Sequence, residues 1–186
     1  LILRRNSYLF GKRAVDIFAA IAGLTLSIPV LALLLPVYRF YKTKPFEKRT
    51  ALGKNNKIIK LILLNELPNS KSRAASMASI ARILPLFLSV FSGDMSLVGT
   101  RLRSGNLSLE DKPEYMDERW HMPPGLTGWC QLNMDSETSE SELNGYDFLY
   151  IASSSLILDA KILLETCLLL LSCTHSRVLI LPVSHL

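Results

Sequence analysis

The residues best suited to chemistry in this chain are its basic side chains. The sequence has 21 lysines and arginines against 16 acids, which gives a net charge of +5. Such charge favours anionic lipid headgroups and a phosphorylated substrate. Nucleic acid is a poorer partner, because no nucleic-acid motif is present and few aromatics lie among the basic residues. The three cysteines and three histidines show neither metal-ligand spacing nor a disulfide framework.

Two short glycine-containing segments hold the candidate polar residues. In GDMSLVGTR, residues 93–101, Asp94 and Arg101 stand at the two ends of an apolar stretch, and Asp94 is also suited to capping a helix or turn. In PPGLTGWCQLN, residues 123–133, prolines and glycines surround Trp129. That composition predicts a shaped loop or a short strand with tight turns, rather than a regular helix.

A long apolar run, residues 14–40, must position these segments. Residues 17–38 carry no charge, and a straight helix of about 22 residues reaches roughly 33 Å, enough to cross a hydrocarbon core. A soluble core helix is the alternative, but it rarely needs so long an uncharged run. We therefore expect this run to be embedded in a membrane.

Prolines and flanking charges favour a particular kind of embedding. Pro29 and Pro36 each remove an amide donor and bend a helix. Basic residues flank both ends of the run, whereas a crossing helix usually has its positive charge on the cytoplasmic side. We therefore predict a re-entrant helix-break-helix anchor with both ends in the cytoplasm, and with Lys12 and Arg13 at headgroup level.

The remaining elements read as mostly helical. Residues 57–64 fit a strand or a helix turn, since periodicity does not decide at this length. Apolar spacing predicts a helix over 73–91, interrupted at Pro85, with Gly93 as its stop. Residues 134–144 read as a loop and 146–172 as one amphipathic helix or a pair. No parallel sheet is predicted.

The predicted fold class is therefore mostly α with irregular loops. It combines the re-entrant anchor with a small, α-rich cytoplasmic domain that has amphipathic interfacial helices. The predicted units are 1–40 for the basic entry and anchor, 41–172 for the cytoplasmic domain, and 173–186 for an unassigned tail.

The order of four segments resembles the bacterial sugar transferase family. These segments are KRAVDIFAAIAGLTLSIPVLALLLPVYRF, GDMSLVGTR, PPGLTGWCQLN and DFLYIASSSLILDAKILLET, which together extend over about residues 10–170. The family comprises monotopic polyprenyl-phosphate sugar-1-phosphate transferases, or phosphoglycosyl transferases, which initiate exopolysaccharide and other glycan synthesis.

The resemblance implies a reaction and its partners. Family members transfer a sugar-1-phosphate from a nucleotide diphosphate sugar, usually a UDP-sugar, to a polyprenyl phosphate such as undecaprenyl phosphate. An aspartate attacks the phosphate that bears the sugar, and a neighbouring glutamate helps to hold Mg²⁺. The implied location is the cytoplasmic face of the bacterial inner membrane. The implied partners are membrane lipid, polyprenyl phosphate and nucleotide sugar, and a homodimer is left open.

The sequence departs from the family at the catalytic pair. The family has Asp-Glu directly before Leu-Pro, where this chain has Arg82-Ile83 before Leu84-Pro85. Neither residue provides a carboxylate. The similar string Asn65-Glu66-Leu67-Pro68 lies about 17 residues too early. We therefore take Asp94 and Glu66 as candidate replacement catalytic groups, with the metal ligands unknown.

Six residues are candidates for substrate binding by the same resemblance: Lys60, Arg101, Arg119, Gln131, Asp147 and Tyr150. All but Gln131 have an alternative. Lys60 is suited to lie at a lipid interface, Arg101 and Arg119 to the surface, and Asp147 and Tyr150 to buried structural hydrogen bonds.

Three functions follow from these observations. The chain is an active phosphoglycosyl transferase, or a catalytically inactive member that binds the same ligands or partners a glycan-assembly protein, or a membrane-anchored structural protein without a ligand. The retained loop segments count against the third function, and the altered catalytic pair separates the first two.

Overall fold

The computed structural model describes residues 2–65, 81–104, 122–135 and 137–171. In chain order its elements are α1 (Ile2–Phe40), β1 (Phe46–Leu52), η1 (Lys54–Asn56), β2 (Ile58–Leu64), η2 (Leu84–Leu86), α3 (Phe87–Ser92), β3 (Ser96–Val98), β4 (Arg103–Ser104), β5 (Gly125–Thr127), α4 (Trp129–Asn133), α5 (Glu140–Ser153) and α6 (Leu156–Leu171). Helices hold most of these residues, as predicted. The predicted unit 173–186, as well as Glu66 and Arg119, lies outside the described residues.

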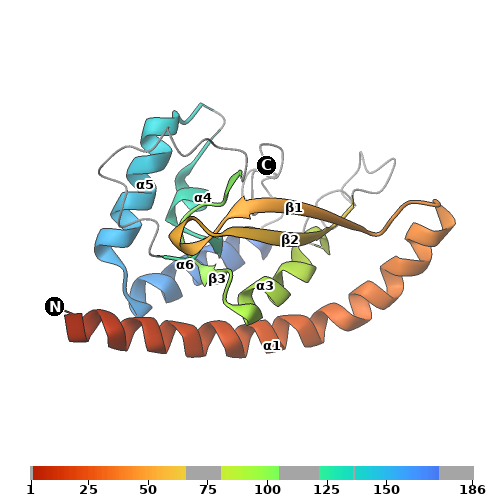
Figure 1. Cartoon of the computed structure of the whole chain (residues 1–186), viewed down its shortest axis with the longest axis horizontal. Helices are drawn as coiled ribbons and strands as arrows, with labels where there is room; N and C mark the ends of the chain where they lie inside the picture. Colours follow the sequence, from red (N-terminus) through yellow and green to blue (C-terminus); the bar gives the residue numbers. More distant parts are fainter. Residues whose placement is uncertain (1, 66–80, 105–121, 136, 172–186) are drawn as a thin grey trace.

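The N-terminal helix α1 is long and apolar enough to cross a membrane. It runs along one side of the molecule and curves toward its C-terminal end (Figure 1). The helix continues through Pro29 and Pro36, so the break predicted there is absent from α1. A proline removes one hydrogen bond, and intact turns on either side let the helix bend rather than end. The re-entrant path stays a prediction.

One face of α1 packs on the rest of the chain and the other is exposed. Lys12, Asp16 and Ala20 are buried at a spacing of four residues. Lys12 is only 5% exposed, so it faces the protein, and its predicted place at headgroup level stays a prediction. Phe10 and Phe18, on the opposite face, are largely exposed. The exposed face is therefore apolar and available to lipid.

Two small sheets follow α1. β1 and β2 form an antiparallel hairpin, which resolves residues 57–64 as a strand, and β4 pairs with the other edge of β1. β3 and β5 pair in parallel, so the expectation of no parallel sheet is wrong. Each of these strands has three residues, too few to give a sequence pattern. A Cβ on Gly99 would lie 2.5 Å from the Gly125 nitrogen, so this close approach requires glycine.

The helices confirm some boundaries and correct others. Pro85 lies in the 3₁₀ turn η2, and Gly93 ends α3 with φ of 92°, as expected of a stop. Trp129–Asn133 is a short helix rather than a loop. α5 begins inside the predicted loop, because Ser139 and Glu142 form a capping box.

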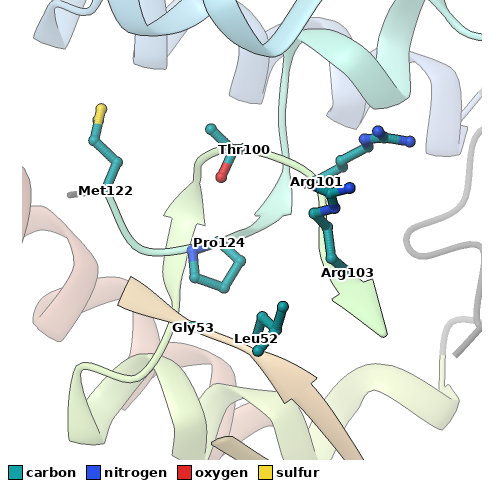
Figure 2. A pocket seen from close by; sticks show the side chains of 7 residues that line it. All are labelled: Leu52, Gly53, Thr100, Arg101, Arg103, Met122 and Pro124. Carbon is teal, nitrogen blue, oxygen red and sulfur yellow. The ribbon is translucent and has the colours of Figure 1, made fainter. Parts of the chain in front are cut away.

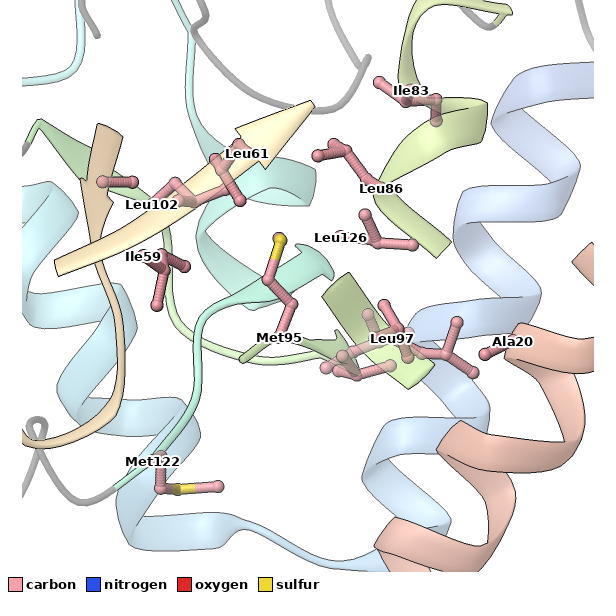
Figure 3. Packing of buried hydrophobic residues seen from close by; sticks show 14 of the residues in the cluster. Ala20, Ile59, Leu61, Ile83, Leu86, Met95, Leu97, Leu102, Met122 and Leu126 are labelled. Atoms are coloured by element: carbon pink, nitrogen blue, oxygen red, sulfur yellow. The ribbon is translucent and has the colours of Figure 1, made fainter. Parts of the chain in front are cut away.

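A single main core joins the sheets to the helices (Figure 3). Four core side chains are essentially inaccessible to solvent: Leu61 of β2, Leu86 of η2, Ile162 of α6, and Met95, which directly precedes β3. Ala20 brings α1 into the same cluster. The apolar helix is thus part of the folded unit, and its polar residues are held in fixed positions against β3 and α6.

Candidate functional site

Arg101 follows the end of β3, and acidic side chains hold its guanidinium group. Its backbone N–H donates to Asp147 Oδ1 (2.9 Å), and its Nε donates to Asp147 Oδ2 (3.2 Å). The guanidinium also pairs with Glu140 and donates to Asn144 Oδ1. Burial acts to lower the pKa of Arg101, but the Glu140 hydrogen bond and the charges of Asp147 and Glu140 outweigh it and raise the pKa. The structure thus unites two predicted residues, Arg101 and Asp147, in an ion pair, and phosphate binding by Arg101 stays a prediction.

Tyr150 belongs to a second buried network. Its hydroxyl donates to Asp159 Oδ1 (2.8 Å) and accepts from Lys12 Nζ (3.2 Å). Lys12 also donates to Asp159 Oδ2 (2.8 Å) and to the Val98 carbonyl (2.7 Å). Burial is the main cause that raises the pKa of the Tyr150 hydroxyl, and the Asp159 charge adds to it. The buried structural hydrogen bond, one of the two roles expected for Tyr150, is therefore present.

Asp16 ties α1 to the same strand. Its carboxylate accepts from Ser96 Oγ (2.8 Å) and from the Leu97 N–H (2.9 Å). Together with the Lys12 contact to Val98, this fixes β3 to the apolar helix. Sequence reasoning did not select Lys12 or Asp16, although Asp16 is the lone acid of the apolar run 14–40.

A cation, Arg82, lies at the position that the resemblance assigns to the family's nucleophile. Arg82 Nη2 lies 3.3 Å from Glu47 Oε2, and Arg49 Nε donates to Glu47 Oε1 (2.7 Å). We call Glu47, Arg49 and Arg82 the hairpin cluster, since two of them come from β1. Ile83, at the second catalytic position, is buried. Glu47 is thus a carboxylate that pairs with Arg82, and two guanidinium groups hold it.

Asp94 and Lys60 lie in more open surroundings. Asp94 accepts from Ser92 Oγ (2.9 Å) and lies 3.6 Å from Lys57 Nζ in a largely exposed pair. Lys60 is exposed on β2, opposite Thr50 of β1. These contacts place Asp94 in a turn, and neither a catalytic role for Asp94 nor phosphate contact by Lys60 is tested by them.

Gln131 is the most unusual of the candidates. It is 2% exposed, and within the part of the chain that the structure describes its amide has no hydrogen-bond partner at Oε1 or Nε2. A Cβ on Gly128 would lie 2.8 Å from Oε1, so the amide abuts the turn before α4. Buried amides are nearly always paired, and a partnerless one needs a reason.

A small hollow lies where the two loop segments meet. Figure 2 shows Arg101 and Arg103 on one side of it and Met122 on the other. Its lining is Leu52, Gly53, Thr100, Arg101, Arg103, Met122 and Pro124. The hollow measures about 10 Å³, room for about one water molecule.

The candidates form separate networks. Arg101 with Asp147, Tyr150 with Lys12, and Arg82 with Glu47 each make their own contacts. Among residues 2–65, 81–104, 122–135 and 137–171, no three acid, histidine or cysteine side chains gather as a metal site.

Comparison with known proteins adds relatives of established name. The family model described as bacterial sugar transferase matches residues 7–173. An exopolysaccharide production protein PSS of Rhizobium leguminosarum is 28% identical, over 83% of this chain and 92% of its own length. A UDP-N-acetylgalactosamine-undecaprenyl-phosphate N-acetylgalactosaminephosphotransferase of Aeromonas hydrophila is 27% identical, over 86% of this chain but 43% of its own length. A UDP-glucose:undecaprenyl-phosphate glucose-1-phosphate transferase of Xanthomonas campestris is 36% identical, over 45% of this chain and 19% of its own length.

Proposed function

Because this chain belongs to the bacterial sugar transferase family, we propose that it serves the step in which a sugar-1-phosphate passes from a UDP-sugar to polyprenyl phosphate. Two of the relatives have names that specify undecaprenyl phosphate as the acceptor. We propose further that the chain keeps the binding part of this step and lacks the covalent transfer.

The hairpin cluster carries the second part of the proposal. The family reaction needs a carboxylate free to attack phosphorus. In this chain Arg82 stands at that position and pairs with Glu47. A carboxylate shared between two guanidinium groups is a poor nucleophile, because its charge is already neutralised. The position is therefore suited to hold an anion and unsuited to form a bond with it.

Mg²⁺, which the family implies, does not fit the described residues at this position. A divalent magnesium ion takes oxygen ligands, commonly one or two carboxylates. Arg82 and Ile83 supply none, and Glu47 already accepts from Arg49 and Arg82. The proposed binding function therefore does not depend on a metal ion at this position.

Ligand binding has independent support in the loop segments. The close approach of Gly99 to Gly125 and Gly128 shows that the backbone of both segments is built as a unit. Beside it, the Gln131 amide is buried without a partner among the described residues. A buried amide without a partner is unusual, and a functional role is one explanation for it.

The transfer reaction itself is the second candidate function, favoured by the relatives' names. It requires a replacement nucleophile. Asp94 is a candidate because its side chain is exposed beyond α3, and Glu66 is a candidate outside the described residues.

Location follows from α1 in the same proposal. Its exposed apolar face supports association of the chain with a lipid bilayer. We propose the cytoplasmic face of the bacterial inner membrane, a re-entrant path for α1, and interfacial positions for the apolar helices. A homodimer is a further open candidate.

A binding and product assay tests the proposal. Purified chain in nanodiscs receives radiolabelled UDP-sugars, undecaprenyl phosphate and Mg²⁺, with binding and lipid-linked label both measured. We expect binding of donor and acceptor without lipid-linked product. Product formation would establish the transfer reaction, and absence of binding to either ligand would refute both functions.

A further inference from the structure

A second hollow lies between α1, β3 and α6, away from the hairpin cluster. It measures about 130 Å³ and is lined by Lys12, Val15, Asp16, Leu97, Val98, Leu156, Asp159, Ala160 and Leu163. Six of these nine side chains are apolar. An apolar protein cavity of about 150 Å³ stays dry and takes up a benzene-sized molecule. The size of this hollow thus suits about one five-carbon hydrocarbon unit.

The polar part of its lining is already satisfied by the protein. Lys12 Nζ donates hydrogen bonds to the Val98 carbonyl, the Tyr150 hydroxyl and the Asp159 carboxylate. The Asp159 carboxylate accepts from Lys12 and Tyr150. Asp16 accepts from the strand β3, as described above. The lining therefore has one cation against two acids, and it repels a phosphate rather than attracting one. An uncharged hydrocarbon is the complementary occupant.

The rim of this hollow is continuous with the apolar surface of the molecule. Val15 and Leu156, from α1 and α6, are 48% and 43% exposed. Next to them, Phe18 and Ile157 are exposed further, at 76% and 84%. Because α1 is the helix suited to lipid, a chain in the bilayer reaches the hollow without crossing water.

The strand β3 connects this hollow to the loop that the family resemblance assigns to phosphate. Leu97 and Val98 line the hollow, and Thr100 and Arg101 follow directly. At about 3.3 Å per residue, Arg101 lies roughly 10 Å along the chain from Val98. A phosphate carried on a chain seated in the hollow would thus lie near that loop.

We propose that this hollow binds an isoprene unit of the polyprenyl phosphate acceptor. The inference rests on the proposed function for the identity of the lipid. It adds a chain-binding site, formed by α1, β3 and α6, that holds the hydrocarbon while the polar network behind it stays intact.

Photolabelling tests this site in the whole chain. A polyprenyl phosphate with a diazirine in its chain is added to the protein in nanodiscs of phosphatidylethanolamine and phosphatidylglycerol, and adducts are mapped by mass spectrometry. We expect adducts on Leu156, Ala160 or Leu163, which unlabelled undecaprenyl phosphate removes and added phosphatidylglycerol does not. A diazirine phospholipid should label these residues far less.

Matched variants on α6 sharpen the test. Ala160→Phe fills the hollow, and losing the burial of about two methylene groups weakens binding roughly tenfold. Leu164→Phe, one turn further on the exposed face, should leave labelling unchanged. Equal labelling by the phospholipid probe, or adducts only outside the lining, would overturn the site even where polyprenyl phosphate binds. Absence of all polyprenyl phosphate binding would overturn the proposed function as well.

Discussion

Two charged networks in this molecule differ in burial and in what they are suited to do. We call Lys12, Tyr150 and Asp159 the anchor network; its ion pair is 6% and 9% exposed. In the hairpin cluster, the Arg82–Glu47 pair is 15% and 30% exposed. The anchor network connects α1 to α5, α6 and β3, whereas the Arg82–Glu47 pair of the hairpin cluster connects β1 to the segment before η2.

This difference in burial separates the network that stabilises the fold from the cluster that contains Arg82. A buried pair is costly to break, because the remaining charge is left without a partner, whereas a partly exposed pair is screened by water. A sequence can therefore change charge at the hairpin cluster while the anchor network keeps the fold. Arg82, which the resemblance aligns with the first residue of the family's catalytic pair, belongs to this partly exposed cluster.

The largest expected effect comes from the anchor network. Asp159→Ala leaves the Lys12 cation buried and unpaired, which should cost about 3–5 kcal/mol. Thermal unfolding in detergent, followed by circular dichroism, measures the loss. The double variant Lys12→Met, Asp159→Leu removes both charges and should recover most of the stability. Equal losses in the single and double variants would show that charge burial is not the cause.

A smaller loss of stability is expected when the ion pair between Arg101 and Asp147 is broken. Asp147→Asn keeps an oxygen for the Arg101 backbone N–H but removes the charge that faces the guanidinium. The expected cost is about 1.5–3 kcal/mol, typical of a hydrogen bond to a charged group. Chemical denaturation in detergent provides the comparison, and Asp135→Asn, an exposed acid, is the control. A loss no greater than that of the control would mean that the Arg101–Asp147 ion pair does not stabilise the fold.

The hairpin cluster should respond weakly in stability. Glu47→Gln removes two partly exposed ion pairs, each worth less than about 1 kcal/mol. It also raises the local charge by one, so binding of uridine monophosphate should tighten about fivefold at low salt and less at high salt. Isothermal titration measures this, with Glu165→Gln on α6 as the charge-matched control. Equal tightening in both variants would indicate an effect of net charge alone.

The smallest effect concerns the start of α5. Backbone and side-chain hydrogen bonds from Ser139 lower the pKa of Glu142. A lowered pKa stabilises the folded state above the ordinary carboxyl value of about 4.3, and this is lost as pH falls through the folded value. Glu142→Gln should therefore melt slightly lower than the parent at pH 7, with the difference fading toward pH 3. A difference that persists at low pH would exclude the carboxylate as its source.

Sequence patterns predicted the elements that are long or that carry strong stop signals. The uncharged run became α1, Pro85 and Gly93 mark turns where expected, and residues 146–171 belong to the helix pair α5 and α6. The sequence does not decide between strand and helix for β2, because seven residues are too few to show a clear hydrophobic periodicity. The start of α5 was missed, although Ser139 and Glu142 have the capping-box spacing.

The site was less predictable, because its contacts join distant residues. Lys12 and Asp159 are 147 positions apart, and nothing local in the sequence pairs them. The parallel pair β3–β5 likewise depends on backbone approach at Gly99 and Gly125. Arg82 was identified by family resemblance, whereas its partner Glu47 emerged only from the fold.

Intact-protein mass spectrometry after brief exposure to a UDP-sugar and Mg²⁺, without acceptor lipid, tests the central claim most directly. An enzyme that uses an aspartate nucleophile would gain the mass of a sugar phosphate and release uridine monophosphate. We predict no mass gain for this chain across several UDP-sugars, although the donor binds. A stoichiometric sugar-phosphate adduct would contradict the account, and its position in the sequence would identify the nucleophile.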